Sequence, residues 1–99
     1  MNMQNLMAQA QKMQRDITKK KEEINAMEFE GKSELVQIVV NGKKEIISVK
    51  ISKDASLDNE DIDILEDMIK IAMNDALSKV DSETEKQLGS YGGSLGGLF

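Results

Sequence analysis

The chain has 99 residues, a net charge of −5, and neither cysteine nor histidine. This length predicts a single domain. Without cysteine the chain has no disulfides and no thiolate chemistry. Without histidine it lacks the residue that most often serves as a general base and as a metal ligand. No apolar run approaches the ~18 residues of a membrane span, and no signal-peptide pattern begins the sequence, so we expect a cytoplasmic protein with no membrane segment.

Residues 1–27 predict one long amphipathic helix without a Pro or Gly. Seven-residue spacing relates two series of positions, which are Met3, Ala10, Ile17, Ile24 and Leu6, Met13, Lys20, Met27. This spacing is typical of a helix that packs along another helix. At 1.5 Å per residue the helix would be roughly 35–40 Å long, which exceeds the width of a small core. We expect it to project from the body, and its apolar stripe favours dimerisation or core packing over ligand binding.

Two or three strands should follow this helix. Residues Leu35–Val40 alternate and predict a strand, with Val36, Ile38 and Val40 on one face. Asn41-Gly42 comes next and predicts a type I′ hairpin turn, because both central residues of that turn need positive φ. Lys43–Ile51 would be the return strand. Phe29–Ser33 is a candidate third strand or edge, with Gly31 as a turn or bulge.

A second amphipathic helix is predicted from about Asn59 to the mid-80s. Asp58 or Ser56 is its candidate N-cap, and acids fill its first turns. Its predicted apolar face consists of Ile62, Leu65, Met68, Ile69, Ala72, Met73, Ala76, Leu77 and Val80. This face is broad enough to cover the sheet. The class is therefore α+β, with one α-β-α domain at residues 1–87 and a flexible Gly-rich tail at residues 88–99.

No catalytic, cofactor-binding or metal site is predicted. Serines and aspartates are present, but no histidine links them, and no phosphate-binding Gly loop precedes a helix. Asp61, Asp63, Glu66 and Asp67 stand at a helix N-terminus, where acids are expected for electrostatic reasons. An enzyme is the least favoured class, and a binding or architectural role remains.

Charge is unevenly distributed along the chain. Residues 1–27 carry five cations and three acids, whereas residues 58–99 carry three cations and ten acids. Lys12, Arg15 and Lys19 are spaced i, i+3 and i+7, so they share one face of the predicted helix. Such a row suits contacts to a phosphate backbone, which position a protein without reading sequence. A solvated helix face is the plainer interpretation of the same charges.

The ordered motifs together resemble the YbaB/EbfC family of small bacterial nucleoid-associated proteins. The resemblance covers nearly the whole chain and rests on Glu30-Gly31, Val36–Val40, Asn41-Gly42, Ile47–Ile51, Leu65-Glu66-Asp67, Asn74-Asp75-Ala76-Leu77 and the final Gly-Gly-Leu-Phe. It implies an α-β-α protomer that dimerises through its sheet region and projects its helices. It also implies binding of double-stranded DNA with little sequence preference, in the cytoplasm over the nucleoid.

Two functional hypotheses follow. In the first, a homodimer grips the DNA backbone, and the candidate phosphate contacts are Lys12, Arg15, Lys19, Lys20, Lys21, Lys43 and Lys44. In the second, the chain is a protein-interaction module that docks a partner through the helical stripe and the Gly-Leu-Phe tail. The acidic C-terminal half favours the second hypothesis, because it repels DNA. A role in dimerisation alone is a third possibility for the stripe.

Overall fold

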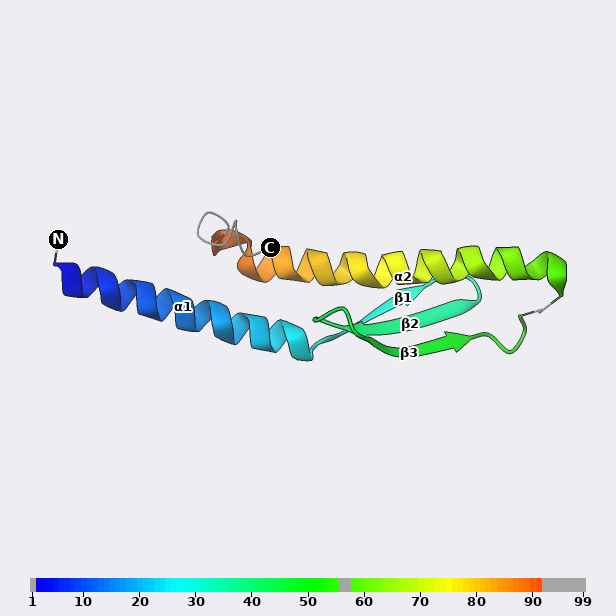
Figure 1. Ribbon diagram of the computed structural model, residues 1–99, viewed down its shortest axis with the longest axis horizontal. Coiled ribbons are helices and arrows are strands. Elements are labelled where there is room, and N and C mark those ends of the chain that lie inside the picture. Colours follow the sequence, from blue (N-terminus) through cyan, green and yellow to red (C-terminus); the bar gives the residue numbers. More distant parts are fainter. Residues whose placement is uncertain (1, 56–57, 92–99) are drawn as a thin grey trace.

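The computed structural model describes residues 2–55 and 58–91, and it has the predicted α+β class. The elements are α1 (Met3–Ala26), β1 (Glu28–Lys32), β2 (Val36–Asn41), β3 (Ile46–Ile51), α2 (Asn59–Leu88) and the 3-10 turn η1 (Gly89–Tyr91). The molecule is a rod of 70 × 20 × 15 Å, with the sheet on one half of α2 and α1 extending past the other end of α2 (Figure 1). Among the described residues, no helix is long and apolar enough to cross a membrane.

Helix α1 begins with a side-chain cap, and its buried residues lie in its C-terminal half. Asn2 Oδ1 accepts a hydrogen bond of 2.9 Å from the backbone N–H of Gln4. Ile17 and Ile24 are the buried residues of α1, and they pack against Leu88 and Tyr91 at the end of α2. The heptad stripe is therefore used over its second half, within the same chain.

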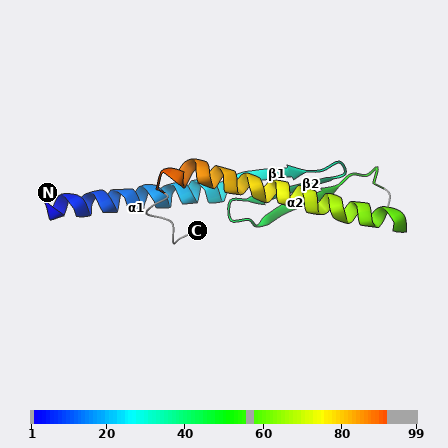
Figure 2. The same cartoon turned by 90° about the horizontal axis from the view of Figure 1, so that it is seen from above.

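The sheet is a three-stranded antiparallel meander in the order β1-β2-β3, so the candidate third strand is confirmed. Helix α2 lies across β1 and β2 (Figure 2). The predicted inner face of β2 is buried there, and the core consists of Phe29, Val36, Ile38, Val40, Leu65, Ala72, Ala76 and Val80. Strand β3 stays outside this core, and its Ile46, Ile47, Val49 and Ile51 are 42–55% exposed.

Gly31 lies inside β1, paired with Ile38, so the prediction of a turn or bulge there was wrong. Its role is close packing. A Cβ at position 31 would lie 2.0 Å from the carbonyl oxygen of Ala72 and 2.5 Å from the backbone nitrogen of Ala76. Helix α2 therefore touches the backbone of β1 directly, which is possible because residue 31 has no side chain.

The type I′ turn at Asn41-Gly42 was also wrong. The loop spans Gly42, Lys43 and Lys44, and the residue with positive φ is Lys44, at 65°. Lys44 N–H donates to the Asn41 carbonyl at 2.9 Å, and Asn41 N–H donates to the Glu45 carbonyl at 3.0 Å. This is the three-residue hairpin loop, in which a left-handed residue follows the turn.

Helix α2 follows Asp58, the predicted N-cap residue, while the alternative Ser56 lies outside the described residues. The helix extends to Leu88, which is 2% exposed, and η1 continues the described structure to Tyr91, beyond the predicted boundary at residue 87. Leu88 is a core residue because it fills the space between α2 and the apolar stripe of α1. Residues 92–99 of the predicted tail lie outside the described residues.

Candidate nucleic-acid interface

The lysines and the arginine predicted to contact phosphates lie in three different parts of the structure. Lys12, Arg15 and Lys19 are all exposed on α1, and the helical spacing puts them on one side of it. Lys12 and Arg15 belong to the part of α1 where every described residue, from Asn2 to Arg15, is exposed. These three side chains therefore form a row of positive charge. The N-terminal part of α1 projects past the end of α2 (Figure 1).

Lys20 occupies a different environment, because it packs against the end of α2. Its Nζ lies 5.1 Å from the centroid of the Tyr91 ring and 3.5 Å from the carbonyl oxygen of Gln87. A cation over an aromatic face is attracted by the ring quadrupole. The lysine in the heptad stripe thus faces the chain's own second helix, and it joins α1 to η1.

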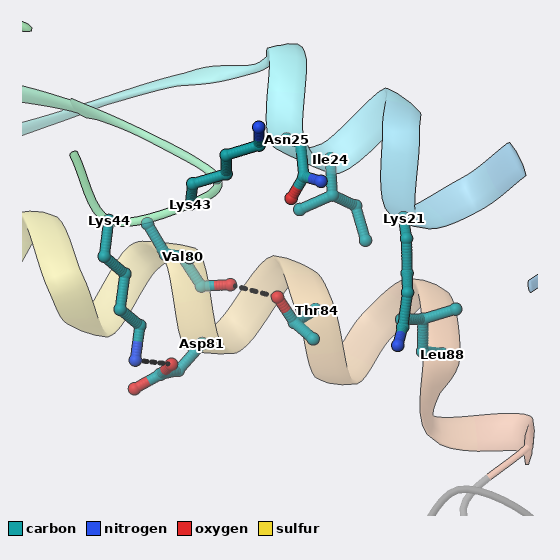
Figure 3. A pocket seen from close by; sticks show the side chains of 10 residues that line it. Lys21, Ile24, Asn25, Lys43, Lys44, Val80, Asp81, Thr84 and Leu88 are labelled. Atoms are coloured by element: carbon teal, nitrogen blue, oxygen red, sulfur yellow. Dashed lines mark hydrogen bonds and ion pairs between the residues drawn. The ribbon is translucent and has the colours of Figure 1, made fainter. Parts of the chain in front are cut away.

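Lys21, Lys43 and Lys44 come together around a groove where α1, the β2–β3 turn and α2 meet (Figure 3). The groove has a volume of about 390 Å³. The other lining residues are Ile24, Asn25, Gly42, Val80, Asp81, Thr84 and Leu88. Three lysines from two parts of the chain that are distant in sequence therefore line one opening.

Two features of the turn bring its lysines to this place. Gly42 touches the end of α1, and a Cβ at position 42 would lie 2.0 Å from the carbonyl oxygen of Ile24. Asn41 Oδ1 accepts hydrogen bonds from the backbone N–H groups of Lys43 and Glu45, at 2.9 and 3.0 Å. The side chain of Asn41 thus fixes the loop, as Asn does in Asx turns.

One acid stands within this basic group. Lys44 Nζ lies 2.9 Å from Asp81 Oδ1, and both side chains are at least half exposed. In Figure 3 Lys44 points down to α2, whereas Lys43 points to α1 near Asn25. An exposed pair of this kind contributes little to stability and opens readily. Asp81 nevertheless lowers the positive potential of the groove.

Another acid, Asp75, makes contacts along the edge between α2 and β1. Asp75 Oδ2 accepts a 3.1 Å hydrogen bond from Lys32 N–H and lies 3.4 Å from Lys79 Nζ. The hydrogen bond from the Lys32 backbone, aided by Lys79, lowers the pKa of Asp75 below its usual value. Lys79 Nζ also donates to the Glu30 carbonyl at 2.6 Å. These contacts dock α2 on the sheet, and within residues 2–55 and 58–91 no acidic cluster has the arrangement of a metal site.

The sequence did not indicate Asn25, Asp81 or Thr84 as neighbours of the turn lysines. They lie far from residues 43 and 44 in the chain, and only the approach of the turn to both helices brings them together. Gly42 is the residue that could have indicated this approach, but the Asn-Gly pattern predicts positive φ at position 42. Its actual requirement is space against α1.

Comparison with known proteins shows a family match over nearly the whole chain. Residues 1–95 match the model of the YbaB/EbfC DNA-binding family. The nucleoid-associated protein gbs1791 of Streptococcus agalactiae is 46% identical over an alignment of 97 residues, and the alignment covers 96% of this chain and 97% of that protein. A nucleoid-associated protein of Streptococcus equi subsp. zooepidemicus is 45% identical over the same shares.

A solved structure shows the same fold. The crystal structure of the uncharacterized protein HP0035 from Helicobacter pylori has a TM-score of 0.72 to this chain at 19% identity. The alignment covers 87% of this chain and 91% of that one. The long helices and the three-stranded sheet thus form an architecture that is also found in distantly related sequences.

Proposed function

Because this chain belongs to the YbaB/EbfC DNA-binding family, we propose that it binds double-stranded DNA as a homodimer, mainly through phosphate contacts and with little sequence preference. Its streptococcal relatives are nucleoid-associated proteins by name, which supports a place in the nucleoid. The observation that carries the proposal is the exposed row of cations on α1, of which Lys12 and Arg15 lie on its projecting part.

The cations of α1 suit the DNA backbone better than they suit base edges. Lys12 and Lys19 are seven residues apart, which is about 10 Å along the helix, and Arg15 lies between them on the same side. Long flexible cations at such spacing reach successive phosphates. Lys21, Lys43 and Lys44 offer a second cluster at the base of the projection.

Dimerisation is supported by the uncovered strand β3. Its four large apolar side chains stay exposed in the single chain, and α2 covers only the other two strands. An apolar surface of this kind on a small protein is typical of an interface. A second copy placed against β3 would bury it and hold two α1 helices in one particle, which doubles the number of phosphate contacts.

The acidic C-terminal half limits the affinity. Residues 58–99 carry ten acids against three cations, and these acids repel DNA wherever they lie near it. We therefore expect contact through α1 and the β2–β3 turn, with the acidic surface of α2 turned away. The same acidity favours the alternative function, a module that docks a protein partner through the apolar stripe of α1.

A titration of unrelated DNA duplexes at several salt concentrations tests the proposal. Phosphate contacts release bound counterions, so the logarithm of the affinity should fall linearly with the logarithm of the salt concentration. Duplexes of different sequence should give similar affinities and slopes. Affinity that does not change with salt would contradict the phosphate mechanism. Absence of binding at low salt would contradict DNA binding and favour the protein-interaction module.

A further inference from the structure

The N-terminal half of α1 carries an apolar surface that no described part of the chain covers. We name it the distal stripe, and it consists of Met3, Leu6, Met7, Ala10 and Met13. Met3 is 76% exposed and Leu6 is 44% exposed. The distal stripe continues the line of Ile17 and Ile24, which pack on the end of α2. In both views α1 extends alone past that end (Figures 1 and 2).

All of the distal stripe except Met13 lies in a segment without charge. The first eleven residues contain no Lys, Arg, Asp or Glu, although 31% of the chain is charged. The first turn of α1 also lacks acids that would offset the helix dipole. A solvated helix of this length is only marginally stable by itself. Neutral amides beside an apolar stripe instead suit contact with an identical surface, because no like charges meet.

We propose that the distal stripe binds the distal stripe of a second copy as an antiparallel helix pair. A two-fold axis on the stripe side of α1, at the height of residue 8, places Leu6 opposite Ala10 of the second copy, so that a large side chain meets a small one. The same axis places Met3 opposite Met13. Flexible methionines at both ends of the contact adapt to the surface that they meet. The heptad spacing supplies the register that such a pair needs.

The position of the α2 end favours the antiparallel arrangement. The end of α2 covers α1 at Ile17, so the bulk of each molecule begins just beyond the distal stripe. In an antiparallel pair the two bodies lie at opposite ends, and Ile17 lies beyond the tip of the other helix. A parallel pair would bring both bodies, and the cations Lys12 and Arg15 of both copies, to the same end.

This interface is separate from the proposed DNA contacts and from β3. At 100° per residue, the Lys12–Arg15–Lys19 row lies on roughly the opposite side of α1 from Leu6 and Ala10. Pairing of the distal stripes therefore leaves the cations free. The paired segment is only about 15 Å long, so each contact is weak and is strengthened when several act together. If the protein also binds DNA as a dimer through β3, as proposed above, such pairing joins dimers into chains.

Cysteine crosslinking tests the pairing, because the natural chain has no cysteine. The variants Leu6→Cys and Ala10→Cys are oxidised mildly, separately and as a mixture, and intact mass distinguishes the products. The proposal expects the mixed 6–10 disulfide in large excess over the 6–6 and 10–10 products. Ala8→Cys is the matched control, because it makes the same substitution two residues away on the opposite side of the helix.

Three results would overturn the proposal. Dominant 6–6 and 10–10 products would show a parallel pair. Equal crosslinking by Ala8→Cys would show random collision. Preferred crosslinking of Leu6→Cys to an Ile47→Cys variant would show that the stripe packs on β3 of another copy instead. The test needs no DNA, so failure of the pairing and failure of the proposed DNA binding are measured separately.

A second measurement uses no oxidation. In sedimentation experiments, Leu6→Gln should weaken the association that goes beyond the β3 dimer at least several-fold, whereas Ala8→Gln should leave it unchanged. Circular dichroism of both variants controls for loss of helix. Equal association of wild type and Leu6→Gln, with α1 intact, would also contradict the proposal.

Discussion

Lys44 and Asp81 connect the β2–β3 turn to α2, with 2.9 Å between Nζ and Oδ1. Lys44 also has a φ of 65°, the left-handed conformation that most residues avoid. Lys44, one of the candidate phosphate contacts, thus has both an acidic partner and an unfavourable backbone conformation. Both features can be changed separately.

Asp81→Asn should strengthen DNA binding. The substitution removes a carboxylate that competes with phosphate for Lys44, and we expect a few-fold gain in affinity at low salt that shrinks as salt is raised. The fold should keep its stability to within about 1 kcal/mol, because exposed pairs contribute little. Glu85→Gln, an exposed acid one turn further along α2, is the control for a general loss of negative charge. Equal gains in both variants would exclude a specific role for the pair.

Lys44→Gly should weaken DNA binding while leaving the fold as stable as the wild type. Glycine adopts positive φ without strain, which should stabilise the folded chain by about 1 kcal/mol. Glycine also raises the entropy of the unfolded chain, which should destabilise the fold by about the same amount. Lys43→Gly has no such compensation and should lose roughly 0.5–1 kcal/mol. Urea unfolding and DNA titration of both variants provide the comparison. A large loss of stability in Lys44→Gly would show that the lysine side chain supports the turn.

Gly31→Ala should destabilise the protein strongly. The added methyl group would meet the Ala72 carbonyl and the backbone of Ala76, which cannot move without separating α2 from β1. We expect a loss of about 3 kcal/mol or failure to fold. Gly89→Ala is the control, since its methyl group would meet only the flexible Glu85 side chain, 2.9 Å away. Thermal unfolding of both variants measures the difference, and similar midpoints would contradict the close contact.

Asp75 should make stability depend on pH in the acid range. Its pKa is lowered in the folded chain by the Lys32 N–H and by Lys79, so its contribution is complete above the unfolded value of 3.8. The contribution is lost as the pH falls through the lower, folded pKa. Asp75→Asn should therefore be less stable than wild type at neutral pH, and the gap should close under acid conditions. Urea midpoints of wild type and Asp75→Asn across this range test the prediction, and a difference that stays the same from neutral to acid pH would contradict it.

Local pattern predicted much of this fold. The alternation of Val36, Ile38 and Val40 and the periodicity of residues 59–88 depend on one face meeting a core, so each could be recognised without knowing the partner. The surfaces against which these faces pack could not be predicted in this way. The heptad stripe of α1 is divided between the chain's own Leu88 and an exposed half, and the sequence contains no sign of where α2 ends beside it.

The candidate site shows the same limit. The row of Lys12, Arg15 and Lys19 follows from helical spacing alone, so it was predictable. The groove at Lys21, Lys43 and Lys44 depends on Gly42 touching Ile24, a contact between residues that local rules do not relate. Local turn preferences assigned Gly42 to positive φ because Asn-Gly is common in tight hairpins. The tertiary contact determined its role instead.

The most direct test of the account compares wild type with Lys12→Ala/Arg15→Ala/Lys19→Ala in DNA titrations at several salt concentrations. Each removed phosphate contact should reduce the salt slope by about one, so the variant should lose about three from the slope and most of its affinity. A Gln4→Ala/Gln11→Ala variant controls for changes to the helix, and sedimentation confirms an unchanged oligomeric state. An unchanged slope and affinity in the folded triple variant would contradict the assignment of DNA binding to α1.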